Sequence, residues 1–327
     1  MRTARRIAPV VIAVALSALT ARPAAAWGCE GHRAIAALAE RLMTPDALAQ
    51  AKALLAAHPI DPDLRRFCPG TPDDPFVDAS TWADDYRDVD RATAPWHFID
   101  FPLSVDATHA DYRRYCPGDN CIVGAIAGQF DRLMSSDDAS ARAQALRFLI
   151  HLVGDVQQPL HDITNRDQGG NCLPVTYEGM APEESRSGSF HPNLHGVWDT
   201  DLIRTLMRTQ HLETPDDLAT YLFARYRPAP VRPRVPTVDL VLSWSRSANG
   251  LARDVAYGKL PVAVTIAAPP TRLPSCSADG MGRRLLALHE RLGEAYEQAS
   301  LPVVGQQLAA AAVRLAEVLD AAFSGSK

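Results

Sequence analysis

The chain has no excess of basic residues. It contains 33 lysines and arginines against 38 aspartates and glutamates, which gives a formal net charge of −5 at pH 7. A protein that binds nucleic acid mainly through a lysine- and arginine-rich surface is expected to be basic. That mode of binding is not expected here, so a phosphate-containing substrate would need positive charge from another source.

Long apolar runs are also missing, apart from one near the start of the sequence. Three arginines precede an apolar stretch over residues 7–19, and three consecutive alanines follow it. This pattern predicts a secretory signal peptide over residues 1–26 that is too short to remain as a membrane span. The mature chain would begin at Trp27 and be secreted or periplasmic. With four fewer arginines, its net charge would be −9.

The six cysteines are an even number in a chain expected to be exported, which favours disulfides over thiolate metal sites. Cys116 and Cys121 enclose the turn sequence Pro-Gly-Asp-Asn and are expected to pair with each other. The remaining four can pair in three ways, of which we favour Cys29 with Cys68 and Cys172 with Cys276.

Alternation of period two is rare in the sequence, so little β-sheet is expected. We predict an all-α fold, a single mainly helical domain over residues 27–327. Thr44-Pro45 and Thr214-Pro215 each indicate a helix N-cap followed by proline at the first helical position. The expected helices cover about residues 31–43, 45–57, 77–87, 122–134, 138–157, 194–208, 214–225, 237–257, 278–299 and 302–323.

Two stretches are not expected to be helical. Segment 162–193 is rich in glycine, asparagine and serine, so it forms either a small hairpin or a long loop near a functional site. We favour the functional loop. Residues 225–236 resemble a linker, but the amphipathic helices that follow need a partner surface. We therefore do not divide the chain into two domains.

Two pairs of histidine and aspartate, each spaced four residues apart, carry most of the functional information. His151 and Asp155 occur in an otherwise apolar helix, and His195 and Asp199 repeat the spacing. Side chains at i and i+4 lie on one helix face with Cβ atoms about 5–6 Å apart, close enough to bind one cation. Burial of unpaired carboxylates is costly, so bound zinc explains both pairs. A proline ends the first helix and places His161 on a loop, where it can reach a different ion.

Three further candidate ligands are isolated in the sequence. His32 follows Trp27 closely, Asp84 lies in a Trp-Ala-Asp-Asp-Tyr run, and His97 lies in a Trp-His-Phe-Ile-Asp run. Taken singly, either histidine is more often a core residue than a ligand. Asp85, the neighbour of Asp84, is expected to face solvent.

Taken together and in this order, the motifs resemble the S1/P1 nuclease family. Members of that family are trinuclear zinc enzymes that share their fold with zinc-dependent bacterial phospholipases C. The resemblance covers dispersed motifs from residue 27 to about residue 203. It implies the same mainly helical fold and three zinc ions per chain. Their charge, about +6 in one cleft, would supply what the acidic surface lacks.

The resemblance implies three metal sites built from histidine and aspartate, with Asp155 bridging the first two. Nitrogen and oxygen ligands suit zinc, whereas an oxygen-only set would favour magnesium or calcium. The implied ligands are Asp84, His97, His151 and Asp155 for the first zinc, Asp155, His32 and the amino nitrogen and carbonyl oxygen of Trp27 for the second, and His161, His195 and Asp199 for the third, more open zinc.

The Trp27 ligand would connect export with catalysis. A free α-amino group has a pKa near 8. Once the metal has displaced its proton, the nitrogen can close a five-membered chelate with the Trp27 carbonyl oxygen. The peptide nitrogen of an uncleaved precursor cannot do this. We therefore predict that precursor extended upstream of Trp27 is inactive or poor in zinc.

The resemblance assigns catalysis to Asp84, Asp155 and Arg87. A water between the paired zincs would have its pKa lowered toward about 7, which prepares it to attack a phosphate. Arg87 follows Asp84 by one helical turn and would bind phosphate oxygens, although it could instead be an ordinary surface ion-pair residue. The third zinc would stabilise the leaving 3′-oxygen and give a 5′-phosphate product.

By the same family pattern, an aromatic residue and a carboxylate after His97 would recognise the base. Phe98 could stack on a base and Asp100 could hydrogen-bond to its edge. Stacking contributes about 1–3 kcal/mol per base whatever its identity, which favours single strands. Asn193 could hydrogen-bond near the third zinc. The alternatives are core packing for Phe98 and a structural role for Asp100.

The implied function is that of a secreted zinc phosphodiesterase acting on single-stranded DNA and RNA, with 3′-nucleotidase activity. The closest alternative is a zinc-dependent phospholipase C, whose open site typically ends in glutamate where this chain has Asp199. A zinc-stabilised binding protein is less favoured, because open coordination positions indicate catalysis. The expected partners are single-stranded nucleic acid or a 3′-nucleotide. We expect a monomer without stable membrane association.

Overall fold

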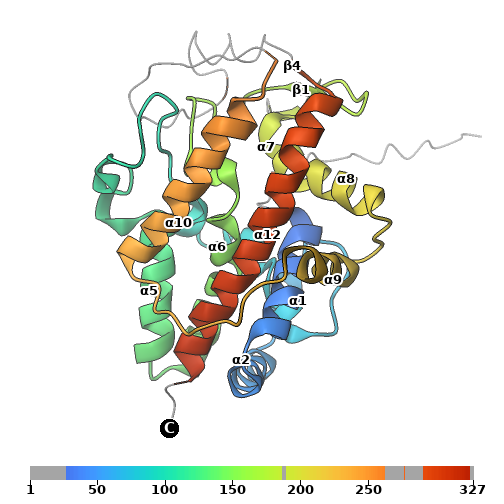
Figure 1. Ribbon diagram of the computed structural model, residues 1–327. Coiled ribbons are helices and arrows are strands. Elements are labelled where there is room, and N and C mark those ends of the chain that lie inside the picture. Colours follow the sequence, from blue (N-terminus) through green and yellow to red (C-terminus); the bar gives the residue numbers. More distant parts are fainter. Residues whose placement is uncertain (1–26, 186–188, 262–275, 277–289, 325–327) are drawn as a thin grey trace, which may run out of the picture.

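The structure is a computed structural model that describes residues 27–185, 189–261, 276 and 290–324. It confirms the mainly helical fold (Figure 1). The predicted signal peptide over residues 1–26 lies outside the described residues and stays a prediction. The α-helices are α1 (Gly28–Leu42), α2 (Pro45–Ala57), α3 (Pro75–Ala79), α4 (Trp82–Tyr86), α5 (Ile122–Ser135), α6 (Ala139–Asp155), α7 (Leu194–Gly196), α8 (Leu202–Thr209), α9 (Pro215–Tyr226), α10 (Val238–Leu251) and α12 (Glu294–Phe323).

Shorter helical turns connect these elements. Helices α7 and α8 are joined by a π-helical turn, and a second π-helical turn extends α10, so the predictions for 194–208 and 237–257 are confirmed as helical with local widening. The short segments are η1 (Pro62–Leu64), η2 (Arg91–His97), η3 (Tyr112–Arg114), η4 (Pro117–Asp119), η5 (Pro159–Asp162), η6 (Val197–Asp201) and η7 (Ala252–Tyr257).

Helix α6 forms the centre of the core. All of its side chains from residue 145 to residue 155 are buried. A helix that is buried on every side belongs to the interior of a protein, and α6 contacts α5, α12, α2 and α4 around it. Its C-terminal end carries His151 and Asp155, so the core helix places these two side chains inside the molecule.

The C-terminal helix differs from the prediction. Two helices at 278–299 and 302–323 were expected, and this is wrong because α12 runs unbroken from residue 294 to residue 323. The residues just before it form strand β4 (Glu290–Leu292). The rest of the first predicted helix, 278–289, lies outside the described residues.

Pro302 lies inside α12 and does not end it. Proline in a helix interior costs about 3 kcal/mol. Tyr296 and Val304 on either side of it are buried in the core, and the Tyr226 hydroxyl donates a hydrogen bond to the Pro302 carbonyl oxygen at 3.2 Å. Packing therefore outweighs the local preference. The long α12 crosses α1, α2, α8 and α9, which are close to it in Figure 1.

The β-structure consists of two small pairs of strands. Strand β1 (Val175–Tyr177) pairs in parallel with β4, and β2 (Glu183–Glu184) pairs antiparallel with β3 (Phe190–His191). Segment 162–193 therefore contains the small hairpin that was the less favoured prediction. Strands of two or three residues are too short to show alternation in a sequence.

The three disulfides are Cys29–Cys68, Cys116–Cys121 and Cys172–Cys276, so the favoured pairing is confirmed. The first fastens the start of α1 to the loop before α3. Within the described part of the chain, no helix combines the length and apolar character needed to cross a membrane.

Residues 77–87 were predicted as one helix, but they belong to two short helices, α3 and α4, separated at Ser80 and Thr81. The Ser80 hydroxyl donates to the Val77 carbonyl oxygen at 2.7 Å. Because the helix is interrupted here, the Ser80 carbonyl oxygen is available to the side chain of His151. The interruption contributes directly to the site.

The expectation that Asp85 faces solvent is wrong. Asp85 is only 5% exposed, and its carboxylate accepts backbone N–H groups from Arg66 at 3.2 Å and Phe67 at 3.1 Å. These bonds fasten the loop that contains Cys68 to α4. Asp85 is therefore a structural carboxylate next to the candidate ligand Asp84.

Candidate metal centre

Three groups of histidine and aspartate side chains converge in the interior. Within each group, one nitrogen or oxygen from every residue lies within 4.8 Å of the others, and all the residues are buried. The groups are His32, His151 and Asp155, then Asp84, His97 and His151, and finally His161, His195 and Asp199.

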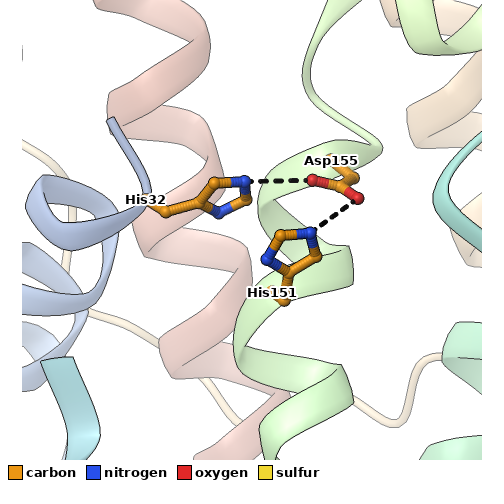
Figure 2. A group of neighbouring side chains, drawn as sticks. All are labelled: His32, His151 and Asp155. Atoms are coloured by element: carbon orange, nitrogen blue, oxygen red, sulfur yellow. Dashed lines mark ion pairs between the residues drawn. The ribbon is translucent and has the colours of Figure 1, made fainter. Parts of the chain in front are cut away.

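Asp155 lies between the first two groups because its carboxylate oxygens face different partners. Oδ1 is 3.2 Å from His32 Nε2, whereas Oδ2 is 2.9 Å from His97 Nδ1 and 3.1 Å from His151 Nε2. Figure 2 shows His32 approaching the carboxylate from α1, while His151 comes from the same helix as Asp155. A carboxylate placed in this way can bridge two cations.

Asp84 completes the group around His97 and His151. Its Oδ1 is 3.9 Å from His97 Nδ1 and 3.8 Å from His151 Nε2. The Arg87 guanidinium lies 2.7 Å from the same oxygen, with 23% of the arginine side chain exposed. We refer to His32, Asp84, His97, His151 and Asp155 as the paired group.

The third group, His161, His195 and Asp199, comes from irregular structure. His161 lies on η5, His195 on α7, and Asp199 on the π-helical turn η6. His195 Nε2 is 3.2 Å from Asp199 Oδ2, and His161 Nε2 is 3.9 Å from Asp199 Oδ1. The two imidazole rings stack with centroids 5.0 Å apart.

Backbone carbonyl oxygens orient three of the imidazoles. In each case Nδ1 is within hydrogen-bond distance of a carbonyl oxygen, which can only accept, so Nδ1 carries the proton and Nε2 faces the group. Such contacts are typical of histidines that bind metal through the other nitrogen. They join His151 to Ser80 O at 2.8 Å, His161 to His97 O at 2.6 Å, and His195 to Gly169 O at 2.7 Å.

The charges in the paired group keep the Asp155 carboxylate ionised. Burial would raise the pKa of Asp155, but the charge of His151 and hydrogen bonds from the surrounding imidazoles hold it well below its usual value. Burial, together with the Arg87 guanidinium, lowers the pKa of His97 to about 4. Burial would also lower the pKa of His151, but Asp155 and Asp84 outweigh it and raise that pKa to about 9. The carboxylate is thus ionised at neutral pH, as a metal ligand must be.

Several polar atoms that point into the groups form no hydrogen bond. They include Asp84 Oδ2 and His161 Nε2. Buried polar atoms without partners are rare, and each one destabilises the folded state. Bound cations would remove this cost. The residues present therefore fit a metal centre with nitrogen and oxygen ligands.

Comparison with known proteins identifies the family, because the sequence model of S1/P1 nuclease matches residues 27–324. The chain belongs to the S1/P1 nuclease family. The match includes the C-terminal helices, beyond the point near residue 203 where the resemblance seen in the sequence ends.

Named members of the S1/P1 nuclease family are similar over different lengths. Nuclease P1 of Penicillium citrinum is 31% identical over 200 residues, which is 60% of this chain and 65% of that protein. Nuclease S1 of Aspergillus oryzae is 30% identical over 179 residues, 54% of each chain. The chain thus spans less than two thirds of these fungal relatives. Endonuclease 3 of Arabidopsis thaliana is 27% identical over 312 residues, 92% of this chain and 90% of that protein.

In this S1/P1 family member, Trp27 lies directly before α1 and is fully buried. Its indole N–H donates to the Gly154 carbonyl oxygen at 2.9 Å, which fastens Trp27 to the residue before Asp155. Gly154 also leaves room for the His32 ring, because a Cβ there would lie 3.1 Å from it. The backbone of Trp27 is therefore held near the paired group. Its role as a ligand stays a prediction.

The paired and third groups meet at one pocket. Phe98 and Asp100 line it, as their proposed contact with a base requires, and both are partly exposed. The pocket is lined by Arg87, His97, Phe98, Asp100, Leu160, His161, Gln168, Gly169, Asn171 and His195.

The pocket residues Gln168, Gly169 and Asn171 were not singled out in the sequence. Gly169 and Gly170 have φ values of 64° and 90°, in the region that favours glycine. A Cβ at Gly169 would lie only 2.4 Å from the Leu160 carbonyl oxygen. The two adjacent glycines were the available signal, because they allow this turn to approach Leu160 and His195 closely. The expected loop beside the site is thus present in segment 162–193, together with its hairpin.

Asn193 serves as the N-cap of α7. Its Oδ1 accepts the Gly196 N–H at 2.8 Å, and its Nδ2 donates to the Phe190 carbonyl oxygen at 2.7 Å. Asn193 is 6% exposed and is not one of the residues that line the pocket. This placement explains the residue structurally, and its substrate-binding role stays a prediction without support from the geometry.

Proposed function

We propose that this protein is a zinc-dependent phosphodiesterase that hydrolyses single-stranded DNA and RNA to 5′-phosphate products and also acts as a 3′-nucleotidase. The observation that carries the proposal is that three buried histidine–aspartate groups lie in an S1/P1 family member and that two of them reach one pocket, through His97 and through His161 and His195. The similar proteins are named as nucleases and endonucleases, which supports the reaction class.

Zinc is the proposed metal because imidazole nitrogens and carboxylate oxygens are both present in every group. When bound, zinc would activate water and offset phosphate charge. The proposed ligands are Asp84, His97, His151 and Asp155 for the first ion, Asp155, His32 and Trp27 for the second, and His161, His195 and Asp199 for the third.

Arg87 is proposed to bind the phosphate. Its guanidinium already contacts Asp84 at 2.7 Å, and the partly exposed side chain lines the pocket. A guanidinium has five N–H donors, so one can remain on Asp84 while others bind phosphate oxygens. Asp84 thereby holds Arg87 at a fixed position beside the paired group.

Phe98 and Asp100 are proposed to bind the base of the nucleotide. Both lie within three residues of His97 in the chain and line the same pocket, so a base held by them would place its phosphate near the imidazoles. An aromatic ring at the pocket wall can stack on an unpaired base, whereas the bases of a duplex are already stacked. This arrangement supports single-stranded substrates.

Export and the monomeric state are proposals as well. Three disulfides fit an oxidising compartment outside the cytosol. We infer that the first 26 residues are removed after export and that the mature protein acts as a monomer. Mass spectrometry of the exported protein and its elution volume in gel filtration test these two points.

The test of the proposed function compares three substrates with mature protein that begins at Trp27. Single-stranded DNA, a 3′-nucleotide and phosphatidylcholine micelles are each incubated with and without a chelator. We expect 5′-phosphate fragments from the DNA and inorganic phosphate from the nucleotide, both abolished by the chelator. Cleavage of the lipid alone would replace the nuclease with a phospholipase C.

A further inference from the structure

Gln158 lies between α6 and η5 and is completely buried. Its side-chain Nε2 donates to Asp199 Oδ1 at 2.5 Å, and its Oε1 accepts the backbone N–H of Leu160 at 2.5 Å. The orientation of the amide follows from its partners, because a backbone N–H can only donate and an ionised carboxylate can only accept. One side chain therefore connects two parts of the third group.

The first connection fixes the plane of the Asp199 carboxylate. With Oδ1 bonded to Gln158, the other oxygen, Oδ2, lies 3.2 Å from His195 Nε2. The second connection caps η5, the short helix that carries His161. Gln158 thus controls the direction of the carboxylate and the start of the segment that supplies an imidazole.

The turn that contains Gln158 is held by the C-terminal helices. Gln307 on α12 donates to the Gln157 carbonyl oxygen at 2.8 Å, and Arg314 on the same helix donates to the Gln157 side-chain oxygen. Asn249 on α10 donates to the Asp162 carbonyl oxygen at 2.8 Å. Both ends of the turn are therefore held by hydrogen bonds, so the backbone at Gln158 has little freedom to move.

We propose that Gln158 is a positioning residue that orients Asp199 for the third metal ion. The inference rests on the proposed function only in requiring that an ion binds between His161, His195 and Asp199. Hydrogen bonds to ligating carboxylates restrict their orientation, and removal of such partners typically lowers metal affinity about 10–100-fold. The same fold-change is expected here, confined to the third ion.

Two variants separate the donor role from the size of the side chain. Gln158→Glu keeps an oxygen that can accept from Leu160, but it places a second carboxylate against Asp199. Gln158→Met keeps a similar volume and adds no charge, yet it also removes the donor. The matched control is Gln157→Glu, since the neighbouring side chain contacts Arg314 and not Asp199.

The experiment measures the release of zinc from each fully loaded mature protein into a competing chelator, alongside thermal melting by circular dichroism. Both Gln158 variants are expected to release the third ion at about 10–100-fold lower chelator concentration, with the other two ions held as in the wild type. Gln157→Glu is expected to hold all three as the wild type does. If Gln158→Glu does not fold, the result for Gln158→Met decides.

Three results would overturn the inference. Wild-type affinity for the third ion in the folded Gln158 variants would show that the amide does not orient Asp199. A parallel loss of all three ions with a fall in melting temperature would show a general structural role, and absence of a third ion in the wild type would remove the site itself. If the wild-type protein binds three ions but cleaves no nucleic acid, only the proposed function is contradicted. The inference about Gln158 remains testable, because the experiment measures zinc binding and not cleavage.

Discussion

The paired group and the third group use the same kinds of ligand but are built differently. His32, His151 and Asp155 lie on the long helices α1 and α6 and are at most 1% exposed. His161 and His195 lie on short segments, are 5% and 8% exposed, and line the pocket. The core therefore encloses one part of the metal centre, whereas loops present the other part to substrate.

The support of the two groups differs in the same way. In the paired group, the spacing of α6 itself brings His151 and Asp155 to one helix face. The third group depends on the Gly169 carbonyl oxygen, which holds His195, and on the Gln158 amide, which holds Asp199. The enclosed ligands His151 and Asp155 lie on a regular helix. The more accessible ligands lie on turns, which need additional hydrogen bonds to hold them in place.

The largest expected effect comes from Asp155→Asn, which breaks the paired group. Asparagine has nearly the same shape as aspartate. It lacks the negative charge and one of the two acceptor oxygens with which Asp155 would bridge the two ions. Loss of an outer contact costs about 10–100-fold, so loss of this ligand should lower activity by more than about 100-fold. Metal analysis should show that both paired ions are lost while the third ion remains.

Asp85→Asn is the matched control, because Asp85 is also a buried carboxylate but accepts hydrogen bonds from the loop at Arg66 and Phe67. It should lower thermal stability but keep every ion. Retention of all the ions in Asp155→Asn would contradict the bridging role.

The next effect is expected from one extra alanine in front of Trp27. The added peptide bond removes the free amine that would bind the second ion, so the protein should contain about one zinc less per chain and lose most of its activity. Zinc content and activity are compared with those of mature protein that begins at Trp27. Equal values for the two proteins would show that the amine is not a ligand.

Metal removal should separate the two groups by their exposure. His97 of the paired group also lines the pocket, but it is only 1% exposed, whereas His161 and His195 are 5% and 8% exposed. A limiting amount of chelator should therefore take the third ion first and the enclosed pair later. Zinc release should therefore show two phases, and His195→Ala should show only the slower one. Release of all the ions in a single phase, or two phases in His195→Ala, would show that the third ion is not more accessible than the paired ions.

The smallest of these effects is expected for Phe98→Ala, which leaves both groups intact. Loss of stacking by about 1–3 kcal/mol corresponds to roughly 5–150-fold weaker cleavage of single-stranded DNA, seen mainly in KM. Phe223→Ala is the control, because Phe223 is 47% exposed on α9 and does not line the pocket. Equal KM values for the two variants would exclude Phe98 from the base site.

The sequence could predict those parts of the fold whose signals are local. The residues at Thr44-Pro45 and Thr214-Pro215 begin helices α2 and α9 as expected, and Thr214 forms a capping box with Asp217. The proposed ligands His151 and Asp155 were singled out for a related reason, because their spacing within a helix is visible in one dimension.

What could not be predicted depends on contacts between distant segments. Pro302 continues a helix only because α12 is packed into the core, and Asp85 is buried only because the loop at residues 66–68 folds onto it. In the sequence, nothing distinguishes Gln158 from any other polar residue before a proline. Its partner Asp199 lies 41 positions away, so its contact appears only in three dimensions.

Anomalous diffraction at the zinc edge, from crystals of the zinc-loaded mature protein, tests the central claim most directly. We expect three anomalous peaks, two of them on either side of the Asp155 carboxylate and one between His161, His195 and Asp199. A single peak at Asp155, or no peak at the third group, would contradict a trinuclear centre assembled from these side chains.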